Sequence, residues 1–421
     1  MTAKYINHNF ELKDQGTSNF VESDNFARHR WYYYKEGFSP NLVRSAIESR
    51  ELTSEHMILD PFNGSGTVTL TAAEQNIPSV GIEVNPFTAF VAKTKTLNTN
   101  PKVLSKLFEE TYENAILGRE YSQLEKYSTF TELSGKDKWL FNLDVLRSFY
   151  GGYSYLENHR SNASKMLRLA LINSIMNVSN ARKDGKCLRY KSAWKELKFS
   201  KNDFLIEFEK HYKKIVEDIE HTIIRSSSKI YNSDSRSILK KQSSYFDLIV
   251  TSPPYLNTFD YTDIYRPELF LGKFISSSEE LYKLRLKTVR SHVQAKWKTP
   301  KSDYIDSLIL KDVYQRLMSN KESLMHPRIP QMVLAYFEDM KGVFYQLSQK
   351  ANKYAHLWMV VSNSAYANAE IPVDLILADI ATKHGWKLKE IGVLREIRKR
   401  KTKYSPDIDT LRESVIILEK K

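Results

Sequence analysis

Short apolar segments that end in polar turns recur along the chain and predict the strands of a buried sheet. The clearest are residues 57–60, 79–83, 246–250, 357–362 and 414–418. Continuous apolar runs of this length are typical of parallel strands that helices cover on both faces. Amphipathic segments such as residues 373–383 separate the strands. This alternation of strand and helix predicts an open α/β sheet.

Residues 101–226 interrupt the alternation with a long stretch of helical periodicity. Phe208, Tyr212, Ile215 and Ile219 would share one face of a helix, and the dense apolar run at 166–176 predicts a buried helix. We therefore expect a mostly helical insertion, 101–226, within a catalytic domain formed by residues 1–100 and 227–421. A smaller and more polar insertion is predicted at 276–330.

The composition indicates a basic globular protein from a reducing compartment. The 421 residues include 63 Lys and Arg against 50 Asp and Glu, and the net charge of +13 favours a polyanionic partner such as nucleic acid. Because Cys187 is the single cysteine, an intramolecular disulfide and a zinc site of several thiolates are excluded. The chain lacks an apolar run long enough for a membrane helix, so we expect a cytoplasmic protein without a membrane partner.

The first chemical motif is a glycine-containing turn, Asp-Pro-Phe-Asn-Gly-Ser-Gly-Thr at residues 60–67, which follows the first predicted strand. Gly64 and Gly66 permit a tight turn and a close approach of the backbone to a ligand. A helix expected to begin near Thr67 would direct its positive end toward that ligand. A P-loop would need a lysine that this motif lacks, and a dinucleotide fingerprint would need glycine or alanine in place of Thr69.

The interpretation that remains is a ligand with a carboxylate, an amine and a ribose. Asp60, at the end of one predicted strand, could pair with an ammonium group. Glu83, at the end of the next, could accept hydrogen bonds from both ribose hydroxyls. Together these features indicate S-adenosylmethionine, whereas the glycine turn taken alone could also be an ordinary connection between strand and helix.

A second motif, Thr-Ser-Pro-Pro-Tyr at residues 251–255, follows the third predicted strand. Pro253 and Pro254 fix the backbone and remove two donors. The Ser252 hydroxyl and the Pro253 carbonyl could then accept hydrogen bonds from an NH2 group on a planar ring, on which Tyr255 could stack. Two acceptors would localise the nitrogen lone pair for attack on a sulfonium methyl group. The alternative is a plain proline-rich turn with a surface tyrosine.

In combination these motifs resemble those of S-adenosylmethionine-dependent, amino-methylating DNA methyltransferases of restriction–modification type. The similarity extends to residues 81–86, 232–236, 252–257 and 411–414, and to residues 29–40, which resemble an N-terminal element that closes over the cofactor. The resemblance implies a doubly wound, mostly parallel sheet of seven strands, the last antiparallel, and a target base that leaves the duplex. It implies a cofactor-binding set of Asp60, Phe62, Gly64, Gly66, Thr67, Glu83 and Asp234, and a catalytic set of Ser252, Pro253, Pro254 and Tyr255.

In that family Ser-Pro-Pro-Tyr is commoner in enzymes that methylate cytosine N4, and Asp-Pro-Pro-Tyr in those that methylate adenine N6. Ser252 therefore favours cytosine N4, with adenine N6 as the alternative. Methylation at cytosine C5 is excluded because it needs a cysteine in the catalytic loop, and Cys187 lies elsewhere. RNA or a protein glutamine as substrate, and a non-catalytic DNA-binding subunit, are further alternatives. We expect no metal ion, double-stranded DNA as the partner and, in a complete system, a cognate restriction endonuclease for the same site.

Three basic stretches that include aromatic residues are candidate DNA contacts: residues 182–191, 285–298 and 395–403. The last lies between two predicted strands, so we expect it on a loop. Neutralising it should weaken DNA binding for every sequence. Residues 101–226 are the candidate region for reading the DNA sequence, although the smaller insertion could also do so. The aromatic run at residues 31–34 could pack in the core or line the pocket, and the pattern does not distinguish these.

Overall fold

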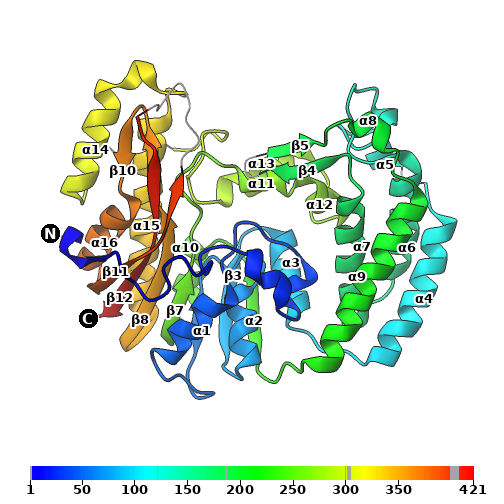
Figure 1. The fold of residues 1–421 in the computed structure, drawn as a ribbon, viewed down its shortest axis with the longest axis horizontal. Coiled ribbons are helices and arrows are strands. Elements are labelled where there is room, and N and C mark those ends of the chain that lie inside the picture. The colour runs from blue at the N-terminus through cyan, green and yellow to red at the C-terminus, as the bar shows by residue number, and fades with distance from the viewer. Residues whose placement is uncertain (1, 121, 185–186, 299, 301–304, 399–406) are drawn as a thin grey trace.

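One eight-stranded sheet organises the molecule (Figure 1). The computed structural model describes residues 2–120, 122–184, 187–298, 300, 305–398 and 407–421. In spatial order the strands are β1 (Ile6–Asn7), β11 (Trp386–Arg398), β12 (Thr410–Lys420), β8 (Ala351–Ser362), β7 (Phe246–Thr251), β2 (Ile58–Asp60), β3 (Ser79–Glu83) and β6 (Ser228–Asn232). Only β12 runs antiparallel to its two neighbours. The predicted α/β class and the antiparallel last strand are confirmed.

The expected number of seven strands was wrong by one short edge strand. Residues Ile6 and Asn7 of β1 pair in parallel with Ile391 and Gly392 of β11. An unpaired edge strand exposes a row of backbone donors and acceptors. β1 covers part of that edge, and nothing in its two-residue pattern distinguishes it from a loop.

The sheet is covered on both faces, as the apolar strands predict. Along β7, Leu248 and Val250 belong to a core shared with α1 (Pro40–Glu48), whereas Ile249 belongs to the core on the opposite face. The helices α2 (Thr67–Glu74) and α3 (Pro86–Lys95) pack on the α1 side. The opposite face is covered by α15 (Ile329–Lys350) and α16 (Val373–Lys383), with the short α10 (Ser235–Ile238) beside α15.

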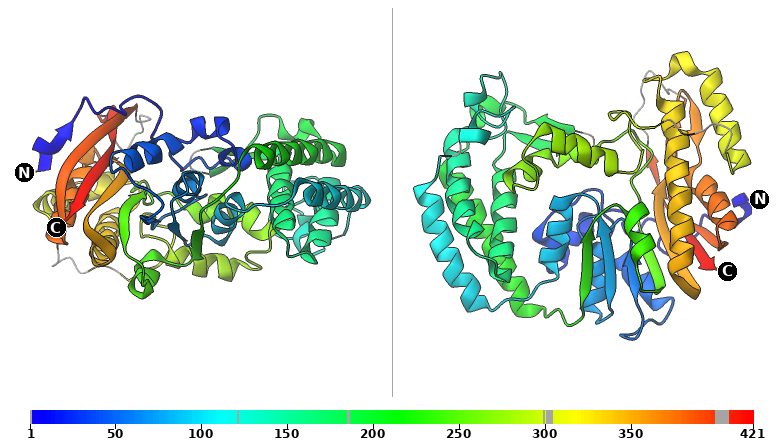
Figure 2. Two further views of the ribbon diagram at one scale, coloured as in Figure 1. Left: turned by 90° about the horizontal axis from the view of Figure 1, so that it is seen from below. Right: turned by 180° about the vertical axis from the view of Figure 1, so that it is seen from behind.

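A second core lies at the far end of the molecule from β11 and β12 in all three views (Figures 1 and 2). It is built from α4 (Pro101–Leu117), α6 (Leu143–Glu157), α7 (Asn162–Asn177) and α9 (Lys201–His221). The buried Phe208, Ile215 and Ile219 share one face of α9, as predicted. The same stretch of chain also holds a hairpin of β4 (Ala181–Asp184) and β5 (Cys187–Tyr190), which the helical pattern did not indicate.

Residues 276–330 divide between the two cores. Leu281 and Leu284 of α13 (Ser278–Lys287) pack in the helical core, together with residues of α11 (Tyr261–Ile264) and α12 (Arg266–Leu271). Val313 and Leu317 of α14 (Leu308–Ser319) instead pack on the sheet core beside α15. Each core therefore receives one of these two helices.

A buried arginine fixes the N-terminal segment that leads into the site. Arg28 is fully buried and donates to the backbone carbonyls of Lys95, Leu97 and Thr222. Its own N–H donates to the Asp218 carboxylate on α9, at 2.7 Å. These contacts join the segment to α3 and α9, because a buried guanidinium must be matched by acceptors to avoid a large desolvation penalty.

Candidate functional site

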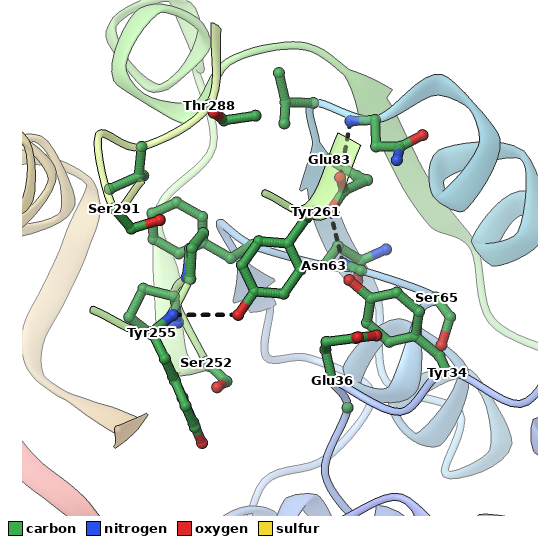
Figure 3. A pocket seen from close by; sticks show the side chains of 18 of the residues that line it. Tyr34, Glu36, Asn63, Ser65, Glu83, Ser252, Tyr255, Tyr261, Thr288 and Ser291 are labelled. Carbon is green, nitrogen blue, oxygen red and sulfur yellow. Dashed lines mark hydrogen bonds between the residues drawn. The ribbon is translucent and has the colours of Figure 1, made fainter. Parts of the chain in front are cut away.

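A cavity of about 260 Å³ lies where the carboxyl ends of β2, β3 and β7 meet. In open α/β sheets, ligands bind at this edge, outside the carboxyl ends of the strands. Ten of the predicted site residues line it: Asp60, Phe62, Gly64, Thr67, Glu83, Asp234, Ser252, Pro253, Pro254 and Tyr255. Gly66 lies outside the lining. In the view of Figure 3, Tyr261 lies between Glu83 on one side and Ser252 on the other.

The two glycines of the turn have different tasks. Gly64 has a φ of +49°, and a Cβ added there would lie 2.9 Å from the Tyr34 ring, so its small size lets this ring pack against the turn. Gly66 has a φ of +89° and precedes the first residue of α2, and its Cβ would lie 2.8 Å from Cβ of Ala92 on α3. Gly66 therefore permits two helices to approach each other and acts on the pocket only indirectly.

Asp60 joins the two sequence motifs. Its Oδ1 atom accepts hydrogen bonds from the Phe62 backbone N–H at 2.9 Å and from the Thr251 hydroxyl at 2.7 Å. Its Oδ2 atom accepts none from any residue that the structure describes. Burial raises the pKa of Asp60 to about 7, because the desolvation of the carboxylate outweighs the two hydrogen bonds. A cationic ligand group at Oδ2 would favour the charged form.

Glu83 is held by backbone donors on both of its oxygens. The Gly64 N–H donates to Oε2 and the Asn85 N–H donates to Oε1, each at 2.8 Å (Figure 3). Burial nevertheless raises the pKa of Glu83 above its ordinary value. The two backbone donors fix the orientation of the Glu83 carboxylate. Each of its oxygens can accept a second hydrogen bond, which leaves room for two ligand hydroxyls.

The loop after β7 presents Ser252 and Tyr255 to the same cavity. The Tyr255 hydroxyl donates to Oε1 of Glu413 on β12 at 2.8 Å, and the Tyr255 N–H donates to the hydroxyl of Tyr261 at 3.4 Å. Burial, and then the nearby Glu413 carboxylate, raise the pKa of Tyr255 well above its ordinary value. Tyr255 is thus a neutral ring whose hydroxyl is anchored at the edge of the pocket.

Asp234 also lines the cavity, at the start of α10. Its side chain accepts from the Arg236 N–H, and its Oδ2 forms an ion pair of 2.8 Å with the Arg236 guanidinium. The same guanidinium pairs with Asp339 on α15 at 2.8 Å. Asp234 therefore lines the pocket as an acceptor that already has a partner.

The aromatic run at residues 31–34 divides between the two roles that the sequence left open, except for Tyr33, which is exposed. Trp31 and Tyr32 are buried in the helical core, where the Trp31 indole donates to Asp218 and the Tyr32 hydroxyl to Glu268. Tyr34 instead lines the cavity and stacks on Tyr265, with ring centroids 5.5 Å apart.

Sequence reasoning missed several lining residues besides Tyr34. Glu36 lines the cavity, accepts a hydrogen bond from the Tyr265 hydroxyl, and has its pKa raised by burial. Glu413 and Arg395 line it from β12 and β11. Glu36 falls within residues 29–40 and Glu413 within residues 411–414, so both could have been sought in segments that the resemblance had marked.

The basic stretches are less available for DNA than their composition suggested. Lys183 pairs with the buried Glu268, Arg285 with Asp260, and Arg290 with Asp339. A buried carboxylate needs such a partner, so these cations are directed inward. Among the described basic side chains of the first two stretches, those that are exposed are Arg182, Arg189, Lys287, Lys296 and Lys298.

We expected the third stretch on a loop, but it begins within a strand. Arg395 lies in β11 and pairs with Glu413 of the neighbouring strand. The expectation failed because the sequence pattern did not identify β11, which extends to Arg398. Lys399, Arg400, Lys401 and Lys403 lie outside the described residues.

Two further properties concern the described residues alone. Their helices include none that is both long enough and apolar enough to cross a membrane. Within the same ranges, no three His, Cys, Asp or Glu side chains gather in an arrangement that could hold a metal ion.

Comparison with known proteins gives relatives that match most of the chain. Type II methyltransferase M.BsoBI of Geobacillus stearothermophilus is 28% identical over 455 residues, which cover 95% of this chain and 87% of the relative. M.AvaI of Anabaena variabilis is 28% identical over 402 residues, 87% of this chain and 80% of the relative. M.MvaI of Kocuria varians is 23% identical over 392 residues, 85% and 81% of the two chains. These relatives confirm the predicted resemblance: over most of its length the chain is similar to type II methyltransferases.

No family model matches the chain. Among solved structures, TrmN from Thermus thermophilus aligns with 96% of this chain and 53% of its own, at 9% identity and a TM-score of 0.32. The assignment of the fold therefore rests on the sheet order and helix placement described above.

Proposed function

We propose that this protein is a type II DNA methyltransferase that transfers a methyl group from S-adenosylmethionine to the exocyclic amine of a base extruded from double-stranded DNA. The observation that carries the proposal is the hydrogen bond from Thr251 to Asp60. It joins the loop suited to an amine-bearing ring to the turn suited to the methyl donor, at one cavity. Similarity to type II methyltransferases over most of the chain supports the same reaction class.

The residues around the cavity fit the methyl donor. S-adenosylmethionine supplies, when bound, an electrophilic methyl group on a sulfonium. The Oδ2 atom of Asp60 is available for its ammonium group. Glu83, fixed by Gly64 and Asn85, is available for the two ribose hydroxyls. Tyr34 closes the pocket beside Gly64.

The loop at residues 252–255 acts on the target amine. An exocyclic amine is a poor nucleophile because its lone pair is delocalised into the ring. The Ser252 hydroxyl and the Pro253 carbonyl accept hydrogen bonds from this NH2 group and favour a tetrahedral nitrogen with a localised lone pair. Tyr255 stacks on the extruded base, which compensates for the stacking that the base loses in the duplex. These are positioning and electrostatic effects, of the kind that supply much of an enzyme's rate enhancement.

Cytosine N4 is the preferred target, because the first residue of the loop is Ser252 and not aspartate. Adenine N6 is the second candidate, since the same acceptors serve either amine. The helical core and the β4–β5 hairpin are the proposed DNA-recognition region, and in a complete system a restriction endonuclease would act on the same site.

The test is methyl transfer to unmethylated bacterial genomic DNA, followed by digestion to nucleosides and mass analysis. N4-methylcytosine is expected, and N6-methyladenine would overturn only the inference from Ser252. Ser252→Ala and Tyr255→Ala should each lower turnover strongly while S-adenosylmethionine still binds. Tyr345→Ala, which removes an exposed ring on α15, is the matched control and should leave turnover unchanged. Cofactor binding without a methylated base would favour RNA or a protein glutamine as substrate, and absence of cofactor binding would favour a non-catalytic subunit.

A further inference from the structure

A buried carboxylate on β12 joins the catalytic loop to the strands β12 and β11. Glu413 is 2% exposed, and each of its oxygens has its own partner. Oε1 accepts from the Tyr255 hydroxyl at 2.8 Å, and Oε2 accepts from Nε of Arg395 at 2.5 Å. Arg395 lies directly opposite Glu413 in the pairing of β11 with β12. Tyr255, Glu413 and Arg395 are thus linked in series by hydrogen bonds, from the catalytic loop to β11.

We propose that Glu413 positions the ring of Tyr255 for stacking, and that Arg395 binds a backbone phosphate of the nucleotide that carries the target base. This inference rests on the proposed function and adds two residues to the site. Glu413 acts through Tyr255 and is a positioning residue, whereas Arg395 would touch the substrate itself.

The positioning role follows from how the Tyr255 ring is held. The ring borders the cavity, and it cannot swing to another χ1 rotamer without moving its hydroxyl away from Glu413. Glu413 in turn is held by the charge of Arg395 and by the strand pairing of β12 with β8 and β11. A ring fixed in advance loses less conformational freedom when a base stacks on it.

The phosphate role follows from the unused donors of Arg395. Its side chain is 37% exposed and lines the cavity. Nε is engaged by Glu413, while Nη1 and Nη2 meet no acceptor in the described part of the chain. A planar guanidinium with two free N–H groups is suited to bidentate binding of an oxyanion.

Two oxyanions could meet these donors: a DNA phosphate or the carboxylate of the methyl donor. The contacts favour the phosphate. Arg395 shares the Glu413 carboxylate with Tyr255, on the side proposed for the base, and comes from β11 and not from the glycine turn. An extruded base remains joined to its two phosphates, so a cation beside the stacking ring lies within the nucleotide's reach.

The same two strands offer a matched control. Lys389 of β11 pairs with Glu419 of β12 at 3.2 Å, and neither residue lines the cavity. Lys389→Ala and Glu419→Gln therefore break a cross-strand ion pair without touching the proposed site. They should leave turnover, DNA affinity and its salt dependence unchanged.

The positioning role is tested by turnover. Glu413→Gln should lower kcat at least about tenfold, with a change below about twofold in the Kd for S-adenosylmethionine. Tyr255→Phe, which loses only the hydroxyl, should lower kcat similarly, and the double variant should be no worse than either single variant. An unchanged kcat for Glu413→Gln, or additive losses in the double variant, would overturn the positioning role.

The phosphate role is tested by binding to duplex DNA that contains the target site. Arg395→Ala should weaken binding about tenfold or more and reduce the slope of log Kd against log salt by about one. A neutral methylphosphonate, placed in turn at each phosphate that flanks the target base, should weaken wild-type binding at one position and have no effect there on Arg395→Ala. If Arg395→Ala weakens binding of S-adenosylmethionine and leaves the salt slope intact, the oxyanion is the cofactor carboxylate and the proposal is wrong.

Loss of Arg395 leaves the buried Glu413 without a cationic partner, so Arg395→Ala could fold poorly. In that case the double variant Arg395→Ala/Glu413→Gln is compared with Glu413→Gln alone. If the double variant and the single variant both retain the full salt slope, phosphate binding is also refuted. Failure of the wild-type protein to methylate DNA would refute the proposed function instead. Wild-type methylation together with unaffected variants would refute only this inference.

Discussion

The raised pKa of Asp60 predicts that cofactor binding depends on pH in a range that is unusually high for an aspartate. In the unliganded protein the pKa is about 7, because burial disfavours the carboxylate. The ammonium of S-adenosylmethionine should bind to the charged form. Between pH 5.5 and 7.0 the charged fraction rises from about 3% to about 50%, so Kd should fall about fifteenfold. Binding should also release a proton.

The assay is isothermal titration at several pH values in buffers of different ionisation enthalpy, which reports affinity and released protons together. Asp60→Asn keeps the acceptor for Thr251 and Phe62 but has no charge. The affinity of Asp60→Asn for S-adenosylmethionine should be lower by about tenfold to a hundredfold at neutral pH, as for the loss of a charged hydrogen bond. This affinity should not change between pH 5.5 and 7.0. Glu83→Gln separates the contribution of the second buried carboxyl. 5′-Methylthioadenosine, which lacks the ammonium, should bind wild-type protein without the pH dependence.

The sign of the stability effect is opposite to that of binding. A carboxyl with an unfolded pKa of 3.8 and a folded pKa of about 7 destabilises the unliganded fold progressively as pH rises between these values. Three pKa units correspond to about 4 kcal/mol as an upper bound. Asp60→Asn should therefore raise the free energy of unfolding at pH 8 and have little effect at pH 4. A wild-type Kd that is flat from pH 5.5 to 7.0, or an Asp60→Asn variant that keeps the slope, would refute the assignment of the ammonium to Asp60.

Three further predictions follow from contacts around the site. Gly64→Ala should weaken S-adenosylmethionine binding about tenfold, because alanine at positive φ is strained and its Cβ would displace Tyr34; a calorimetric titration checks this. Arg28→Met should lower the free energy of unfolding by about 3 kcal/mol in urea, since its buried acceptors lose their donor. Lys183→Met should destabilise the fold by a similar amount, about 3 kcal/mol, and leave the salt slope of DNA binding unchanged. Arg182→Ala, at an exposed site on the same strand, should leave stability unchanged and reduce that slope by about one. A reduced slope for Lys183→Met with a loss of stability for Arg182→Ala would show that the inward and outward cations have been misassigned.

The sequence determined the parts of this protein in which neighbouring residues carry the signal. The apolar runs identified β2, β3, β7, β8 and β12, and the helix predicted at residues 373–383 coincides with α16. The two motifs were recognisable because glycine and proline constrain the backbone wherever they occur. Strands β6 and β11 were missed. β6 is only partly buried, and the charged residues of β11 obscure its apolar face.

Only the tertiary structure decided which charges are available. Lys183, Arg285, Arg290 and Arg395 look like surface cations in the sequence, yet each has a carboxylate partner far along the chain or on a neighbouring strand. Such pairing depends on residues that meet only after the sheet and the helical core have formed. For the same reason no local pattern could link Tyr255 to Glu413, 158 positions away, or place Tyr34 against Gly64. Local sequence specifies backbone shape and burial, whereas the environment of a charged or aromatic side chain is set by long-range packing.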